Sequence, residues 1–77
     1  MQIRVTYSGV LKIESVENGS LVEVEEGTTI SGFLTRCKIL QQHHKLIVPI
    51  VNGESRRLTY VLNEGDQLNL LLPIGGG

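Results

Sequence analysis

Several features that would indicate an enzyme or a cross-linked fold are missing from this chain. Its single cysteine cannot form an internal disulfide, and no cluster of residues has the spacing of metal ligands. The sequence also contains no Ser-His-Asp combination, glycine-rich phosphate-binding loop or HExxH pattern. We therefore expect the protein not to be an enzyme, and to bind no metal or cofactor itself.

Strong charge and long apolar runs are missing as well. The chain has 7 basic and 8 acidic residues and a formal net charge of −1, which gives no electrostatic footprint for nucleic acid. No apolar stretch approaches the roughly 20 residues of a membrane helix, and no basic, apolar leader opens the chain. Its 77 residues leave room for one core. We expect one soluble, cytoplasmic domain without a nucleic-acid or membrane partner.

What the chain does have is a distinctive end, in which an apolar run leads into three glycines (Leu71-Leu72-Pro73-Ile74-Gly75-Gly76-Gly77). Without Cβ atoms, terminal glycines can pass through a narrow channel and bring the carboxylate up to a nucleotide phosphate. An enzyme that activates a protein C-terminus with ATP needs this property. The alternative interpretation is an inert tail, because chain ends are commonly frayed.

Alternation of apolar and polar residues predicts three strands, at residues 1–7, 21–25 and 67–72. Each strand has an apolar face and an opposite face that is more polar. The apolar faces are formed by Ile3, Val5 and Tyr7, by Val22 and Val24, and by Leu68, Leu70 and Leu72. Such strands are typical of a sheet that is covered on one side.

Residues 10–19 fit two patterns. If Asn18-Gly19 forms a two-residue turn, the segment pairs with the second strand as a hairpin that places Ile13 opposite Val24. The other possibility is a short helix that ends at Gly19. The β-branched residues of the segment favour the extended form.

A helix is indicated after residue 28, with Thr28 or Thr29 as the N-cap. Its apolar stripe at i, i+3, i+4 and i+7 consists of Ile30, Phe33, Leu34 and Cys37. Because Cys37 lies on this stripe, we interpret it as a core residue. Gly32 within the helix suggests close packing or an irregular first turn.

The remaining elements complete an α+β pattern. His43 and His44 fall in the predicted exit loop of the helix and are expected to be solvated. Residues 46–51 predict a near-continuous apolar strand, residues 58–61 a short strand or bridge, and residues 63–66 a turn. This order predicts a mixed sheet of about four to five strands with one main helix packed on one face.

This order and this ending resemble the ubiquitin-like β-grasp fold. Residues 1–5 and 22–30 are similar to ubiquitin. The stretch 65–77, an acidic turn followed by an apolar strand, a proline and glycines, resembles the small sulfur carriers of the MoaD/ThiS type. These are the small subunit of molybdopterin synthase and the carrier of thiamine thiazole synthesis. The segment Val51-Asn52-Gly53-Glu54 also resembles a strand end of that family.

The chain departs from the family pattern in places. Gly75 stands where the family usually has a small residue other than glycine, and Leu70 and Leu71 replace aromatic residues of the last strand. Residues 8–19 are longer than the first turn of ubiquitin. These differences weaken any choice of pathway, but they leave the predicted fold unchanged.

The resemblance implies a carrier with a β-grasp domain at residues 1–72 and a flexible functional tail at residues 73–77. An adenylating partner would use ATP to activate the Gly77 carboxylate, and a persulfide donor would convert it to a thiocarboxylate. Gly75 and Gly76 would thread the tail into the partner, and Pro73 and Ile74 would bind the partner as well. An acceptor synthase subunit would then receive the sulfur, for molybdopterin in the first place and thiamine thiazole in the second.

We expect partners to dock on the sheet face that the helix leaves open. The predicted docking patch consists of Ile47, Pro49, Val51 and Leu71, with Arg4 at its rim. Leu71 is expected to lie beside Arg4. The alternative is that residues 8–19 fold over this face and bury it.

Two other functions stay open at this point. The first is a ubiquitin-like protein modifier that forms isopeptide bonds through Gly77. The second is a non-catalytic β-grasp interaction domain whose tail is inert.

Overall fold

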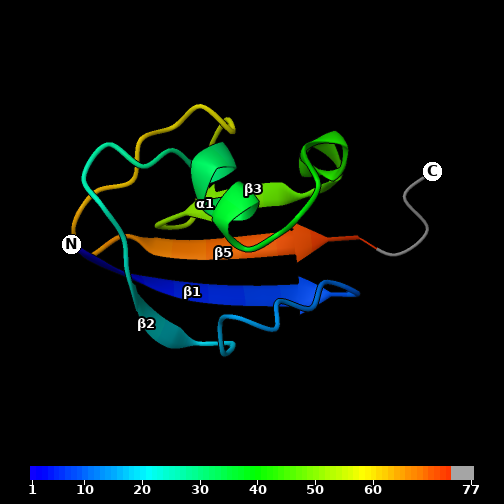
Figure 1. Ribbon diagram of the computed structural model, residues 1–77, viewed down its shortest axis with the longest axis horizontal. Helices are drawn as coiled ribbons and strands as arrows, with labels where there is room; N and C mark the ends of the chain where they lie inside the picture. Colours follow the sequence, from blue (N-terminus) through cyan, green and yellow to red (C-terminus); the bar gives the residue numbers. More distant parts are fainter. Residues whose placement is uncertain (74–77) are drawn as a thin grey trace.

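The computed structural model describes residues 1–73, which form a mixed sheet with two short helical segments on one side (Figure 1). The elements in chain order are β1 (Gln2–Gly9), β2 (Ser20–Glu23), α1 (Ile30–Arg36), the 3₁₀ helix η1 (Gln41–Leu46), β3 (Val48–Val51), β4 (Glu54–Ser55) and β5 (Gln67–Leu72). The predicted α+β architecture, with five strands and a main helix on one face, is confirmed.

The last strand lies in the centre of the sheet. The strand order is β2-β1-β5-β3-β4, and β5 runs parallel to β1 and antiparallel to β3. The β1–β5 register extends from Arg4 opposite Gln67 to Gly9 opposite Leu72. Strands β1 and β5 therefore point the same way, and the chain leaves β5 at the end of the sheet far from the N-terminus (Figure 1).

The core lies between the sheet and the helix, as the alternating pattern requires. It combines the inward residues of the strands with the helix stripe and with side chains from the first connection. The most deeply buried side chains are Ile3, Val5, Ile30, Phe33, Leu34, Val51, Leu62, Leu68 and Leu70. Cys37 is also buried, as predicted, and burial raises the pKa of its thiol.

Both ends of α1 are closed by recognisable caps. At the start, the Thr29 hydroxyl accepts a hydrogen bond from the Gly32 backbone N–H at 3.0 Å, so Thr29 is the N-cap. A Cβ at Gly32 would lie 3.3 Å from that same hydroxyl, which accounts for the glycine within the helix. At the other end, the Lys38 N–H donates to Thr35 and the Ile39 N–H to Leu34, the two bonds of a Schellman motif.

The segment 10–19 is neither the favoured hairpin nor the alternative helix; both predictions are wrong. The Asn18 side chain takes the place of a paired strand, because its amide bonds both the N–H and the C=O of Tyr7, at 2.9 and 2.7 Å. The Tyr7 hydroxyl donates to the Val16 carbonyl at 2.7 Å. These contacts hold an irregular loop that buries Leu11, Ile13 and Val16 in the core.

The connection after α1 also differs from the prediction. Residues 41–46 form η1, so the strand begins only at Val48 and not at Leu46. His44 is 2% exposed, which makes the prediction of a solvated side chain wrong. Its Nε2 bonds the Ile39 carbonyl at 2.9 Å and its Nδ1 lies 3.1 Å from the Ser31 hydroxyl. Through these two contacts, the His44 ring joins η1 to α1.

Candidate functional site

The candidate site is centred on the end of β5, where the chain leaves the sheet. The last β1–β5 pair joins Gly9 to Leu72, and the Val10 N–H lies 3.4 Å from the Leu72 carbonyl oxygen. Gly9 has a φ of +78°, and a Cβ there would overlap that oxygen. Glycine is required because the two backbones approach so closely. Residues 9 and 10 thus fix the base of the tail.

The predicted tail lies largely outside the described residues. Pro73 is exposed next to Leu72, at the end of the sheet. Ile74, Gly75, Gly76 and Gly77 are not among the residues that the structure describes, so their predicted roles stay predictions.

The outer face of the sheet, opposite the helix, becomes less polar towards the tail. The register places Leu21, Arg4 and Gln67 in one row and Thr6, Asn69 and Ile50 in the next. The row next to the tail consists of Ser8, Leu71 and Val48. Leu71 therefore lies beside Ser8 and not beside Arg4, contrary to our expectation.

Three of the residues predicted for the docking patch lie on the wrong side of the sheet. Ile47 and Val51 are 5% and 1% exposed, and Pro49 is buried as well. They face the helix, since Val51 pairs with the inward Leu68. The outward residues of β3 are Val48 and Ile50, which take the places predicted for their neighbours.

The first connection does not cover the outer face. Its apolar residues belong to the core on the helix side, where Lys12 and Ser15 lie near Cys37 and Ile39. The outer face has instead an open depression lined by Arg4, Thr6, Ile50, Gly53, Gln67 and Asn69. Arg4 lies at its edge, with its guanidinium donating to the Gly19 carbonyl at 2.7 Å. The alternative that residues 8–19 bury this face is therefore wrong.

A second polar centre is structural, and it lies at Asp66 in the turn predicted at residues 63–66. The Asp66 carboxylate is 5% exposed and accepts hydrogen bonds from the Asn52 side chain, the Tyr60 hydroxyl and the Asn63 N–H, at 2.9, 3.2 and 2.8 Å. These three donors come from the segments on either side of Asp66 in the fold, the turn after β3 and the connection before β5. Asp66 therefore holds the turn before β5 to the turn after β3, and both of its carboxylate oxygens accept hydrogen bonds.

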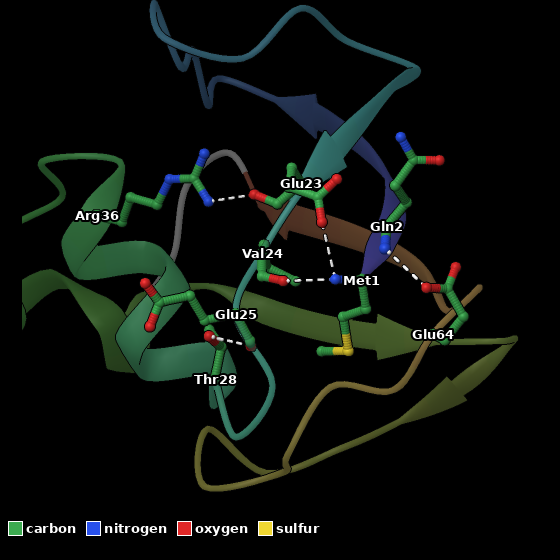
Figure 2. A network of polar contacts seen from close by, with 8 residues as sticks. All are labelled: Met1, Gln2, Glu23, Val24, Glu25, Thr28, Arg36 and Glu64. Carbon is green, nitrogen blue, oxygen red and sulfur yellow. Dashed lines mark hydrogen bonds and ion pairs between the residues drawn. The ribbon is translucent and has the colours of Figure 1, made fainter.

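The start of the chain is fastened at the end of the sheet away from the tail (Figure 2). The N-terminal ammonium donates to the Glu23 carboxylate at 2.8 Å and to the Val24 carbonyl at 3.0 Å, and the Gln2 N–H donates to Glu64 at 3.1 Å. Arg36 donates to the Glu23 carbonyl at 2.6 Å, which ties the end of α1 to β2. This end of the molecule is therefore held in place by internal contacts.

Within residues 1–73 there is no helix long and apolar enough to cross a membrane. In the same part of the chain, no three side chains of His, Cys, Asp or Glu come together as they would around a metal ion.

Comparison with known families identifies the chain. The sequence profile of the ThiS family matches residues 5–77, which includes the terminal glycines. The chain belongs to the ThiS family. The predicted membership of the MoaD/ThiS-like carriers is thus confirmed. Comparison with curated proteins gives no significant match.

Solved structures show that the ThiS-family chain has the predicted β-grasp fold. The chain is similar to SAMP1 from Haloferax volcanii, with a TM-score of 0.67, 17% identity and 100% of both chains covered. It is also similar to a Pyrococcus furiosus protein assigned as molybdopterin converting factor, subunit 1, with a TM-score of 0.70 and 17% identity over 95% of this chain and 98% of the other. A second structure of the H. volcanii small archaeal modifier protein 1 gives the same values. At this identity the likeness concerns the fold.

Proposed function

We propose that this ThiS-family protein is a sulfur carrier whose Gly77 carboxylate is adenylated by a partner enzyme and converted to a thiocarboxylate. The observation that carries the proposal is the family match, which runs through the terminal glycines to residue 77. The carrier is the substrate of its partners and not a catalyst. ATP belongs to the activating enzyme.

The position of the tail supports this role. Its base is the end of the central strand, paired with β1 on one side and β3 on the other, so the attachment point is rigid. Pro73 then leads away from the sheet as an exposed residue. A reactive group carried beyond a fixed base can be delivered to the active sites of two partners in turn.

The chemistry needs an unhindered terminal carboxylate. A carboxylate oxygen of Gly77 attacks the α-phosphorus of ATP, pyrophosphate leaves, and an acyl-adenylate forms. The terminal sulfur of a donor persulfide then attacks the carbonyl carbon and displaces AMP. A thiol reduces the S–S bond of the resulting acyl disulfide, which leaves the thiocarboxylate. Because Gly77 has no side chain, the carbonyl carbon is open to each nucleophile.

We further propose that partners dock on the outer face, at the row next to the tail. Leu71 and Val48 are neighbours there, and Val48 is 38% exposed. Ile50 continues the apolar surface one row further, and Arg4 lies beyond it at the edge of the depression. A small apolar centre with a polar rim is the usual composition of a protein interface.

The test is the intact mass of the protein after incubation with ATP, a sulfur donor and the adenylating enzyme of its host. The expected product carries one sulfur in place of one oxygen. Deletion of Gly76-Gly77 should abolish the mass change, and Gly77→Ala should reduce its rate severely. An unchanged mass with every candidate adenylating enzyme would favour an interaction domain with an inert tail.

The second candidate is a protein modifier, which the structural likeness to small archaeal modifier protein 1 favours. Both functions begin with adenylation of Gly77, but a modifier ends as an isopeptide bond to a lysine. Lysine-linked adducts in cells would distinguish it from a carrier. Among carrier pathways we place molybdopterin first and thiamine thiazole second, since the chain length and the long first connection resemble the molybdopterin-synthase subunit.

A further inference from the structure

A groove lies beside the base of the tail, on the helix side of the sheet. Three parts of the chain line it: residues 10–12 after β1, residues 38–47 around η1, and Leu72 at the end of β5. Buried Leu11 and Ile47 form its floor. Its walls are apolar side chains that remain open to solvent.

The exposure of these walls is concentrated in one place. Val10, Leu40 and Leu46 are 55%, 59% and 51% exposed and all line the groove. They make up half of the large apolar side chains that residues 1–73 leave exposed. An apolar surface gathered in this way is typical of an interaction site, whereas single exposed leucines are ordinary.

The rim of the groove is basic. Lys12, Lys38 and His43 line it, and no acidic residue does. This is a local excess, because the whole chain has a net charge of −1. Neither lysine forms a salt bridge within the part of the chain that the structure describes. The rim therefore complements a segment that carries carboxylates.

The backbone of Lys38 is strained for a lysine. It occupies the left-handed position after α1, with a φ of 64°, where helices usually place glycine. A side chain in this conformation is disfavoured, because its Cβ approaches the following carbonyl. The cation at the rim is therefore held there at the expense of stability, which suggests a use for its charge.

The groove is linked directly to the tail base. Val10, in one wall, places its N–H 3.4 Å from the carbonyl oxygen of Leu72. Leu72 itself lines the groove and precedes Pro73 in the chain. Whatever occupies the groove contacts the residues that fix the direction of the tail.

We propose that the groove binds a segment of the activating enzyme in which an apolar side chain is flanked by Asp or Glu residues. The apolar side chain would fill the groove between Leu40 and Leu46, and the carboxylates would pair with Lys12 and Lys38. This contact would hold the enzyme against the base of the tail during adenylation. The inference rests on the proposed function and adds to it a second docking surface, on the helix side.

The test is carrier-dependent ATP–pyrophosphate exchange by the host adenylating enzyme, with KM for the carrier and kcat measured separately. Two groove variants are used, Leu40→Ser with Leu46→Ser, and Lys12→Glu with Lys38→Glu. Each should raise KM by about tenfold or more and leave kcat nearly unchanged, because they weaken docking and not the chemistry. The effect of the charge variant should shrink at high salt.

Lys38→Gly separates binding from folding. Glycine relieves the left-handed strain, so this variant should unfold at a temperature a few degrees higher, about 2–5 °C, while its KM rises. The matched controls are Lys45→Glu, an exposed lysine of η1 outside the groove, and Val61→Ser, an apolar side chain 47% exposed elsewhere. Both should keep a KM within about twofold of the parent value.

The possible failures are distinguishable. If the parent protein supports exchange and the groove variants match the controls, the groove inference is wrong and the proposed function stands. If the parent protein supports no exchange, the proposed function fails, and the inference fails with it. A parent protein that is dimeric in sedimentation, with groove variants that are monomeric, would assign the groove to a second copy and also overturn the inference.

Discussion

At the scale of single residues, Gly9 has the most direct influence on the tail. It closes the β1–β5 ladder opposite Leu72, and its missing Cβ is what lets the Leu72 carbonyl come so near. A side chain there meets backbone, which cannot rotate away as a flexible side chain would. The last rung of the ladder must therefore open if Gly9 is replaced.

We predict that Gly9→Ala destabilises the fold by about 2–4 kcal/mol, because left-handed strain and the backbone clash add. Adenylation of Gly77 should also slow, since the tail base shifts. Urea unfolding measures the first effect and the exchange assay the second.

Gly27→Ala is the matched control for Gly9→Ala. Its φ of +88° imposes the same strain, but no heavy atom lies within 4 Å of the added Cβ. It should cost only about 1–2 kcal/mol and leave adenylation unchanged. Equal losses of stability in the two variants would show that the clash with Leu72 does not matter.

At the scale of elements, the sequence predicted best those that bury one face. β1, β5 and the helix stripe show clear periodicity, and the inward residues Ile3, Val5, Leu68 and Leu70 are buried as expected. β3 shows no such alternation, because residues 46–51 are all apolar or proline and none is polar. The sequence therefore did not determine which residues of β3 face outward. The predicted docking patch contained Ile47, Pro49 and Val51, which face the helix, in place of Val48 and Ile50.

The irregular elements depend on contacts between residues far apart in the chain. Residues 10–19 are held by Asn18 and by the Tyr7 hydroxyl, and no local pattern reveals a side chain that pairs with a strand. His43 and His44 are adjacent and identical in type, yet only His44 finds two partners and becomes buried. Such differences follow from tertiary packing, which periodicity does not describe.

The faces of β3 can be separated by matched substitutions. We predict that Val51→Asp destabilises the fold by about 3 kcal/mol or more, because it places an unpaired carboxylate in the core. Val48→Asp lies on the outer face and should cost less than about 1 kcal/mol, while it weakens docking of the adenylating enzyme. Urea unfolding and the KM for the carrier are the measurements. A Val48→Asp variant that unfolds as readily as Val51→Asp would mean that the outer face is covered.

At the scale of the whole molecule, the order of elements and the glycine ending were enough to predict the fold and the family. The base of the candidate site also follows from the sequence, because a last strand that ends in glycines places the tail at the end of the sheet. The groove was not predicted, since its walls come from three separate segments that only the tertiary fold brings together. Local patterns identify elements, whereas surfaces between elements need their arrangement.

The two ends of the sheet hold different parts of the chain, so a substitution at one end can be tested separately from the other. Strand β5 finishes at one end, and the N-terminal ammonium is bound at the other (Figures 1 and 2). The hydrogen bond to the Glu23 carboxylate raises the pKa of the ammonium above its ordinary value of 8.0. Desolvation opposes this shift, and the charges of Glu23, Glu64 and Glu26 add to it. The proton is thus bound more tightly in the folded state.

This shift predicts how stability depends on pH. Because the folded pKa is raised, the contribution of the ammonium is complete below pH 8.0 and is lost as the pH rises through the higher folded value. The urea midpoint should therefore fall over this alkaline range, and by less in Glu23→Gln. The effect should be small, since the Glu23 carboxylate is exposed to solvent.

The difference between the two variants isolates the ammonium from other groups that titrate in the same range, such as the Cys37 thiol. Glu54→Gln is the control, because Glu54 pairs with Arg56, which stays charged throughout. It should shift the midpoint equally at every pH. Adenylation should be unaffected in both variants, because the Met1–Glu23 contact lies at the end of β1 opposite to the tail base. A pH profile of Glu23→Gln parallel to that of the parent protein would mean that the ion pair contributes nothing to folding in solution.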